Sequence, residues 1–273
     1  MPWSFTDDVD AFLDTAGPAL AARPAENTQI LTVAETLRLH GPHAYGDAAP
    51  LLGWWRGAAG EIAGTLVQTP PYPTLLGYVA PEAVGPLTAA LPLPRINADR
   101  ATAERIAAGR PGHRVEQEQR LYRLATLVPP SPAPSGRPRA AAAADRELLV
   151  RWVRDFAGGT GQSGAHAERL VDERIASGGL VLWEDDGVPV SMAGVSPRIA
   201  GMVRVSTVYT PPERRGRGYA AAVTAEISRA AREAGAQEVL LFTDLANPTS
   251  NGVYLRIGYR PVSDRLLISV AER

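Results

Sequence analysis

Hydrophobic positions in the second half of the chain alternate between helical and extended spacing. Apolar side chains recur with a helical period from Asp145 to Phe156 and again through Leu170 and Ile175. Short apolar runs then predict strands, and the Asp186-Gly187 step is a strong hairpin signal between the first two. The predicted strands are 180–183, 188–195, 202–209, 239–242 and 265–270, with helices at 219–234 and 248–257. This order of elements predicts the α/β class with a mixed sheet.

The first half of the chain repeats this order. Helical patterns at 9–20 and 27–39 precede apolar runs at 51–55 and 61–68. Trp55 followed by Ala63-Gly64 resembles Trp183 followed by Ala193-Gly194, at an offset of about 130 residues. A shared offset of this kind indicates an internal repeat, although a chance match between two hairpins explains it as well.

A proline-rich segment separates the two halves. Prolines recur from Pro129 to Pro138, where they remove backbone donors and favour an extended spacer. The sequence therefore predicts a first domain at 1–128, a linker at 129–140 and a second domain at 141–273.

Composition narrows the range of chemistry. The 273 residues include no Cys, which excludes disulfides, thiolate nucleophiles and sulfur-ligated zinc. His40, His43 and His113 show no metal-ligand spacing, so no metal site is expected. All basic side chains are Arg, which excludes a Schiff-base Lys and a P-loop Lys. The richness in Ala, Gly, Pro and Arg is typical of a GC-rich bacterial genome.

Charge and hydropathy give no sign of a nucleic-acid or membrane partner. The formal net charge is -1, and a nucleic-acid role for the few arginines near position 215 is disfavoured on that ground. The acidic start of the chain lacks the basic end of a signal peptide. No apolar run approaches the roughly 18 residues needed to cross a bilayer. We therefore expect a cytoplasmic location.

The glycines between the strand at 202–209 and the following helix form the most informative segment. Gly216 and Gly218 precede a helix that begins at about Tyr219. The first N–H groups of a helix are unpaired and carry partial positive charge, so such a helix start can bind phosphate. Glycines allow close approach of the backbone, and Arg215 and Arg217 add charge unless they point to solvent. The spacing differs from that of dinucleotide-binding and Walker loops.

A second polar segment follows the strand at 239–242. Asn247 is a suitable N-cap for a short helix, Pro248 suits its first position and Gly258 suits its end. Asn247, Asn251 and Tyr254 are spaced i, i+4 and i+7 and share one helix face. Alone, this pattern is explained by a structural cap and a packed Tyr. Together with the glycine loop about 27 residues earlier, it indicates a ligand site.

The two segments together resemble the motifs of the GNAT superfamily of N-acetyltransferases. That family's signature, Arg or Gln, then Gly three residues later and Gly or Ala two residues after it, is met by Arg215, Gly218 and Ala220. The segment from Asn247 to Tyr254 resembles the family's second element. The resemblance covers residues 141–273 and the first half only weakly. It implies a GNAT-like fold, two tandem GNAT-like domains and an acyl-coenzyme A-dependent acyltransferase.

The resemblance also implies roles for individual residues. The pyrophosphate of acetyl-CoA would bind the glycine loop and helix start, and its pantetheine chain would pair with the end of the preceding strand. Tyr254 would be the catalytic acid that protonates the leaving thiolate after direct attack by an amine and a tetrahedral intermediate. The implied cofactor contacts are Val208, Tyr209, Thr210, Arg215, Gly216, Arg217, Gly218, Tyr219, Ala220, Asn247 and Asn251.

The acceptor and the base are less defined. The resemblance favours a small-molecule amine, and an alkyl ammonium with a pKa near 10.4 is only about one part in a thousand neutral at pH 7. A base is therefore needed, and Glu184, Asp185 and Asp244 are candidates that no spacing separates. Asp185 also suits a turn, and Asp244 also suits a cap. A longer acyl donor and a non-catalytic acyl-CoA-binding regulator remain alternatives, and the oligomeric state stays open.

The first half lacks the cofactor loop. Residues 73–82 contain no match to the signature and no paired glycines. We therefore expect a degenerate domain that braces the active one and forms part of the acceptor cleft. Trp54, Trp55 and Tyr72 are candidates for lining that cleft, with burial in a core as the alternative.

Overall fold

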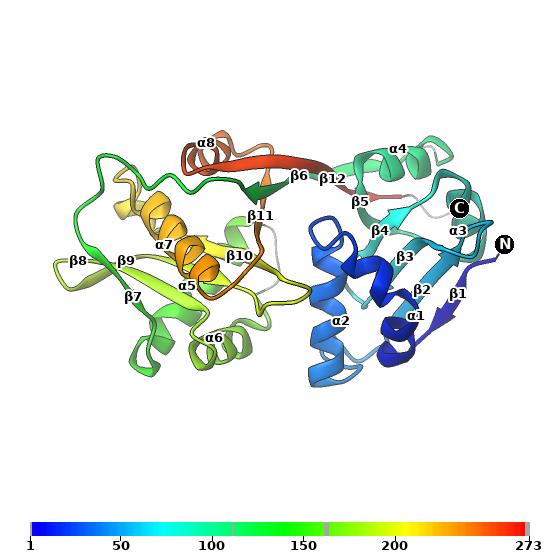
Figure 1. Ribbon diagram of the computed structural model, residues 1–273, viewed down its shortest axis with the longest axis horizontal. Helices are drawn as coiled ribbons and strands as arrows, with labels where there is room; N and C mark the ends of the chain where they lie inside the picture. Colours follow the sequence, from blue (N-terminus) through cyan, green and yellow to red (C-terminus); the bar gives the residue numbers. More distant parts are fainter. Residues whose placement is uncertain (1, 111, 161–163, 271–273) are drawn as a thin grey trace. The chain divides into compact units, whose positions relative to one another are not determined.

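The described chain forms two compact units. The computed structural model describes residues 2–110, 112–160 and 164–270 (Figure 1). Unit 1 comprises Met1–Leu121, Asp244–Ala246 and Val262–Arg273, and unit 2 comprises Tyr122–Thr243 and Asn247–Pro261. The chain passes from one unit to the other within two long strands, β6 (Arg114–Leu124) and β12 (Tyr259–Ser269). It also does so on either side of the short segment Asp244–Ala246.

This division differs from the boundaries expected from the prolines. The first boundary lies within β6, before the proline-rich segment, and the end of the chain belongs to unit 1. Part of the expected linker is a strand, β7 (Arg137–Ala140), which pairs antiparallel with β8 (Leu180–Asp185). Pro138 is tolerated there because β7 is the edge strand, where a missing N–H interrupts no ladder on the open side.

Both halves of the chain use one order of elements: strand, two helices, three strands, helix, strand, helix, strand. The first half contains β1 (Ser4–Thr6), α1 (Val9–Ala21), α2 (Thr28–His40), β2 (Leu51–Arg56), β3 (Ile62–Gln68), β4 (Thr74–Val79), α3 (Pro81–Ala90), β5 (Arg95–Asp99), α4 (Arg100–Ala108) and β6. The second half contains β7, α5 (Arg146–Thr160), α6 (Ala167–Ala176), β8, β9 (Val188–Val195), β10 (Met202–Tyr209), α7 (Tyr219–Glu233), β11 (Glu238–Asp244), α8 (Pro248–Arg256) and β12. The predicted mixed α/β class is confirmed.

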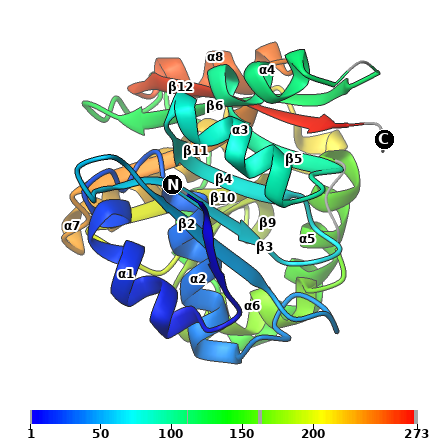
Figure 2. The same ribbon diagram turned by 90° about the vertical axis from the view of Figure 1, so that its right-hand side faces the viewer.

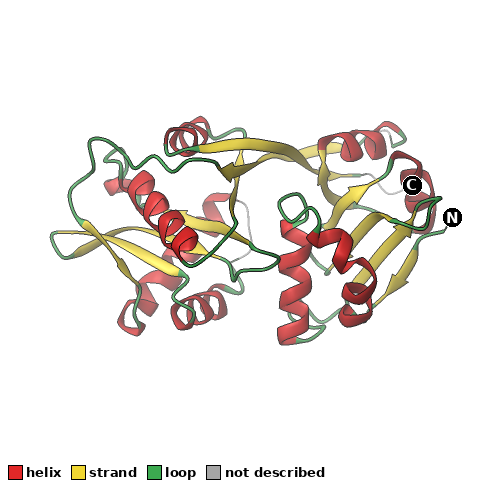
Figure 3. Ribbon diagram, in the orientation of Figure 1, coloured by secondary structure: helices red, strands yellow, loops and turns green. Residues whose placement is uncertain are grey.

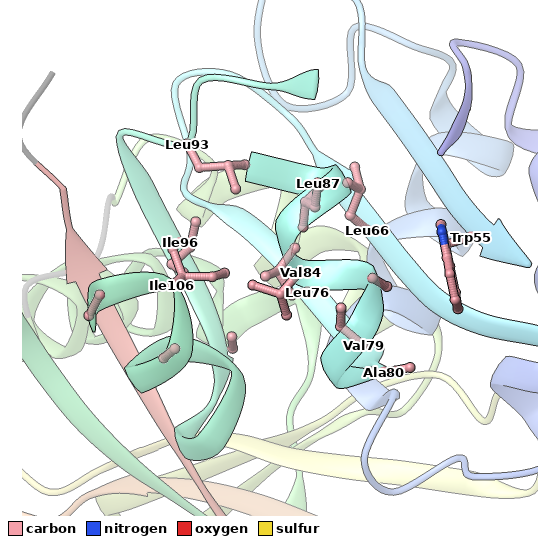
Figure 4. Packing of buried hydrophobic residues seen from close by; sticks show 14 of the residues in the cluster. Trp55, Leu66, Leu76, Val79, Ala80, Val84, Leu87, Leu93, Ile96 and Ile106 are labelled. Carbon is pink, nitrogen blue, oxygen red and sulfur yellow. The ribbon is translucent and has the colours of Figure 1, made fainter. Parts of the chain in front are cut away.

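The core of unit 1 lies between its sheet and the helices α3 and α4. Leu76 and Ile96 of the sheet pack with Val84 and Leu87 of α3 and with Ile106 of α4 (Figure 4). Figure 2 shows α3 on one side of strands β2 to β4 and the helices α1 and α2 on the other.

The aromatic residues considered for the acceptor cleft lie in or against packed regions of unit 1. Trp55 is buried in the core of this unit. The ring of Trp54 lies 6.5 Å from that of Phe12. Tyr72 makes an edge contact with Tyr45 at 5.8 Å between ring centroids.

Unit 2 has helices on both faces of its sheet, as Figure 3 shows. Its strands are ordered β11, β10, β9, β8 and β7, with the end of β6 (Tyr122–Leu124) beside β11. Leu149 and Val153 of α5 and Val171 of α6 pack on Leu182 and Met192 from one face. The helices α7 and α8 bury the opposite face in a second cluster. None of the helices in the described part of the chain combines the length and apolar character needed to cross a bilayer.

The two halves of the chain share a backbone irregularity, although the residues that suggested an internal repeat do not correspond. From Leu76 to Val79, β4 spans three residues opposite only two of β3. In the same way, β10 spans three residues from Ser206 to Tyr209 opposite only two of β9. Both strands therefore carry a bulge, at an offset of 130 residues. Gly64 and Gly194 do not correspond, because one pairs after the bulge and the other before it.

Candidate functional site

The strands β10 and β11 of unit 2 separate partway along their length. Their parallel pairing runs from Met202–Glu238 to Val205–Leu241, whereas β10 continues to Tyr209 and β11 to Asp244. At the bulge, Thr207 has a φ of 48°, a left-handed conformation that is uncommon for a residue with a Cβ. A bulge re-aims backbone groups away from the ladder. Among the described strands, the end of β10 therefore has an edge toward β11 that no partner strand uses.

The glycine loop after β10 leads directly into α7. Gly216 and Gly218 have φ values of 77° and 84°, so a side chain at either position would be strained. A Cβ at Gly216 would meet no heavy atom within 4 Å, which leaves open space beside the backbone. Gly218 is the N-cap of α7, and no side chain caps that helix start. The first N–H groups of α7 thus remain available to an anion, as the sequence predicts.

The arginines of the loop have different roles. The Nε of Arg215 donates to the carbonyl oxygen of Thr210 at 3.0 Å and so closes the loop on itself. Arg217 is exposed and makes no such contact within the described chain. Arg217 therefore places a positive charge near the helix start that no hydrogen bond within the described chain engages.

Tyr219 is the first residue of α7, but its side chain packs inside the protein and hydrogen-bonds Asp185. The side chain is buried, and its hydroxyl donates to Oδ2 of Asp185 at 2.5 Å. Ser135 donates to the same carboxylate oxygen at 2.9 Å. These two hydrogen bonds lower the pKa of Asp185, and the one from Tyr219 has the larger effect.

Tyr254 on α8 lies in the same buried cluster as the start of α7. Val208 and Ala221 pack against this cluster, which brings the two sequence motifs together. The ring of Tyr254 makes an edge contact with that of Tyr259 at 6.1 Å, and no described residue hydrogen-bonds its hydroxyl. Burial raises the pKa of Tyr254 to about 12, so the hydroxyl stays protonated at neutral pH.

The asparagines of this motif have structural partners. Oδ1 of Asn247 accepts from the backbone N–H of Ser250 at 3.0 Å, which is the predicted N-cap. Nδ2 of Asn251 donates to the carbonyl oxygen of Asn247 at 2.7 Å, and its Oδ1 accepts from the Tyr122 hydroxyl at 2.8 Å. A cofactor contact of either asparagine stays a prediction.

The three candidate bases are engaged by other groups. Glu184 accepts from Arg139 at 2.6 Å. Asp185 accepts the two hydrogen bonds described above. Asp244 belongs to unit 1, where it accepts from Gln117 at 2.9 Å. Each of the three carboxylates thus has hydrogen-bond partners within the described chain, and the arrangement singles out none of them as the base.

A hollow of about 340 Å³ lies beside the end of β10, on the α5 side. Its lining includes Trp152, Asp155, Tyr209 and Glu213, and the Tyr209 hydroxyl donates to Oδ2 of Asp155 at 3.3 Å. Sequence reasoning missed Asp155 and Glu213 as site residues. One signal was present: Trp152 and Asp155 are three positions apart on a predicted helix and hence share a face.

The corresponding place in unit 1 is built differently. Pairing of β4 with β5 stops at Leu75–Asn97, as it stops early between β10 and β11. Beyond that point, the buried guanidinium of Arg265 donates to the carbonyl oxygens of Leu76 and Asn97 and to Oδ1 of Asn97, each at 2.8 Å. A single residue separates β4 from α3, so no loop precedes the helix.

Comparison with known proteins agrees with this geometry. Residues 147–259 match the model of the acetyltransferase (GNAT) family. Among solved structures, a GNAT-family acetyltransferase from Colwellia psychrerythraea is 10% identical, with 100% of each chain covered and a TM-score of 0.66. A GCN5-related N-acetyltransferase from Sphaerobacter thermophilus is 17% identical, with 97% of this chain and 94% of that chain covered and a TM-score of 0.62. A Drosophila protein is 13% identical, with 97% of each chain covered and a TM-score of 0.67.

The comparisons with solved structures extend over both halves of the chain. A search of the curated proteins found no match. At such low identities the solved structures establish the fold, which is GNAT-like in the first half as well as the second. The family match covers the part of unit 2 that holds the bulge, the glycine loop and Tyr254. The chain is therefore an acyltransferase that carries a GNAT-family acetyltransferase domain at residues 147–259.

Proposed function

We propose that the protein transfers an acetyl group from acetyl-CoA to the amine of a small molecule, at a single site in unit 2. The observation that supports this most is the convergence of three features on one end of β10. They are the free strand edge after Val205, the uncapped start of α7 and the protonated hydroxyl of Tyr254.

The donor fits the groups present. The N–H groups at the start of α7 and the open space at Gly216 suit a diphosphate. The backbone of residues 208–210 suits a pantetheine chain, because its amide groups pair as a neighbouring strand would. A backbone N–H beside the bulge then holds the thioester oxygen as negative charge develops on it.

Tyr254 holds the proton that the leaving sulfur needs. Its raised pKa keeps this proton on the hydroxyl at neutral pH. Because no described residue engages that hydroxyl, it is available to the sulfur atom as the carbon–sulfur bond breaks. The acceptor amine approaches from the hollow beside Tyr209, whose lining includes the carboxylates of Asp155 and Glu213 as well as the guanidinium of Arg214.

We also propose that unit 1 is degenerate and binds no donor. Arg265 occupies the place between β4 and β5, and the phosphate-binding loop is missing between β4 and α3. One acyl-CoA per chain follows from this arrangement.

Calorimetric titration with coenzyme A and an assay of thiol release with a panel of amines test the function together. We expect one equivalent of coenzyme A per chain and acceptor-dependent release of the free thiol. Binding without thiol release for every amine would instead indicate an acyl-CoA-binding regulator. Absence of binding would contradict the whole proposal.

A further inference from the structure

Arg174 of α6 lies beside the bulge and forms no ion pair within the described chain. Its stem passes close to Gly179, where a Cβ would lie 3.1 Å from its Cδ. Its Nη1 is buried and hydrogen-bonds no described residue. The neighbouring carboxylate of Glu173 is exposed and lies 3.8 Å from Arg169. Arg174 therefore forms no ion pair within the described chain, and the charge of Glu173 acts on it only from a distance, raising its pKa.

Thr207, the bulged residue of β10, presents a second unpartnered group at the same place. Its Oγ1 is buried and has no hydrogen-bond partner among the described residues. Both groups surround Gly194 of β9: a Cβ there would lie 2.5 Å from Oγ1 of Thr207 and 3.3 Å from Nη1 of Arg174. A glycine inside a strand often marks a close approach of a ligand or another chain segment. Here both unpartnered polar atoms lie beside this glycine.

No ion pair balances the charge of Arg174 within the described chain. Burial, and then the positive charge of Arg204, lower the pKa of Arg174 to about 10, so that the guanidinium still carries its charge at neutral pH. A buried cation costs free energy unless an anion pairs with it. A guanidinium beside a hydroxyl donor is the arrangement that proteins use to bind a carboxylate, through two parallel hydrogen bonds.

We propose that Arg174 and Thr207 bind a carboxylate of the substrate. This inference rests on the proposed acyl transfer, because Thr207 directly precedes the backbone of residues 208–210, with which the pantetheine chain is proposed to pair. The carboxylate belongs either to the acceptor, as in an amino acid, or to the acyl group of the donor, as in a dicarboxylic monothioester. Both sources place the same anion next to the reacting carbonyl.

Matched substrate pairs separate the two sources. In the acceptor arm, kcat/KM for acetyl-CoA is compared between glycine and glycinamide, and between phenylalanine and phenylalaninamide. The amino group of the amide is a weaker base than that of the amino acid, so a larger fraction of it is neutral at a given pH. A preference for the amino acid therefore cannot come from the fraction of neutral amine. In the donor arm, succinyl-CoA is compared with acetyl-CoA at a constant amide acceptor. We expect a preference of tenfold or more for the carboxylate in one arm.

Variants then connect the preference to the residues. Arg174→Gln is expected to remove the preference by lowering kcat/KM for the carboxylate substrate at least tenfold, with a change below threefold for its neutral partner. Thr207→Val is expected to weaken the preference less. Arg229→Gln is the matched control, because Arg229 is a cation of the same unit that pairs with Glu226 and Glu233 at the surface.

A binding measurement keeps the inference independent of turnover. Succinate, but not succinamide, should raise the melting temperature of the wild-type protein, and Arg174→Gln should abolish that shift. No preference in either arm, or a preference that survives Arg174→Gln, would overturn the carboxylate site. Failure of thiol release with every substrate, together with an Arg174-dependent succinate shift, would instead overturn the proposed function and leave the anion site standing.

Discussion

Tyr254 and Arg174 both place a titratable group in a poorly solvated part of unit 2, but burial acts on them in opposite directions. Desolvation disfavours the charged form of each side chain. For Tyr254 this raises the pKa and keeps a proton in place, and for Arg174 it lowers the pKa without removing the charge at neutral pH. The first residue therefore carries its proton at neutral pH, although burial makes it a weaker acid, and the second still attracts an anion.

Tyr254→Phe tests the proposed acid. Loss of the hydroxyl should lower kcat by about a hundredfold, within the usual contribution of a general acid, and should leave the dissociation constant for coenzyme A unchanged within threefold. Tyr259→Phe is the control, since Tyr259 is buried in the same cluster and its hydroxyl lies 2.7 Å from that of Ser228. Turnover of Tyr254→Phe equal to that of the wild type at several pH values would remove the acid role.

Arg174→Met tests whether the buried cation is held at a cost to stability. Because the folded-state pKa is lower than the unfolded one, the cost is fully present below about pH 10 and is relieved as the pH rises through that value. At pH 7 the variant should therefore unfold at a higher temperature, by roughly 2–4 °C for each kcal/mol relieved. A lower melting temperature would show that Arg174 stabilises the fold through contacts of its own.

At the scale of elements, the site is made by one strand end and the helix that follows it. The bulge redirects the backbone of β10, the glycines turn it, and α7 begins without a side-chain cap. Each step leaves backbone groups unpaired that an ordinary strand–turn–helix connection would satisfy. These groups are therefore available to a ligand.

Gly216→Ala tests this loop with a well-matched control. Gly216 and Gly187 have nearly equal φ values, 77° and 76°, and an added Cβ meets no heavy atom within 4 Å at either. Both substitutions should cost about 1 kcal/mol of strain, measurable by urea unfolding. Only Gly216→Ala should weaken binding of coenzyme A in calorimetry, by about tenfold. Equal affinities in the two variants would place the diphosphate elsewhere.

At the scale of the whole molecule, the two halves of the chain have one order of elements but differ at corresponding strand pairs. The space beyond the paired part of β10 and β11 is built differently from that beyond β4 and β5. The bulge of β10 carries Thr207 with Arg174 nearby, whereas the space beyond the paired part of β4 and β5 in unit 1 is filled by Arg265. Arg265 is buried, but its guanidinium has three hydrogen bonds. This satisfied arginine is structural, in contrast to the unpartnered one in unit 2.

Arg265→Leu tests that role. The variant leaves buried carbonyl oxygens without their donor, each at a cost of about 1–3 kcal/mol, so the free energy of unfolding should fall by several kcal/mol. Urea unfolding measures the loss, and the number of coenzyme A molecules bound per chain should stay at one. A second equivalent bound by the wild-type protein would contradict the degenerate role of unit 1.

Local sequence pattern was sufficient for most elements of unit 2. The strand at 202–209 and the start of α7 at Tyr219 lie where the hydrophobic period and the glycines predict them. The N-cap at Asn247 is also present as predicted. These features depend on neighbouring residues in the chain, and a local period or cap signal is visible without knowledge of the fold.

The tertiary structure alone decided which distant residues meet. The boundary between units falls inside β6 and β12, Pro138 lies in an edge strand, and Arg174 reaches the bulge at Thr207 across two glycines. No local pattern marks any of these, because strand pairing and side-chain burial join positions far apart in the chain. The sequence by itself thus determined the elements and the glycine loop before α7. Long-range packing decided the unit boundaries, the place of Arg265 in unit 1 and the position of Arg174 beside the bulge in unit 2.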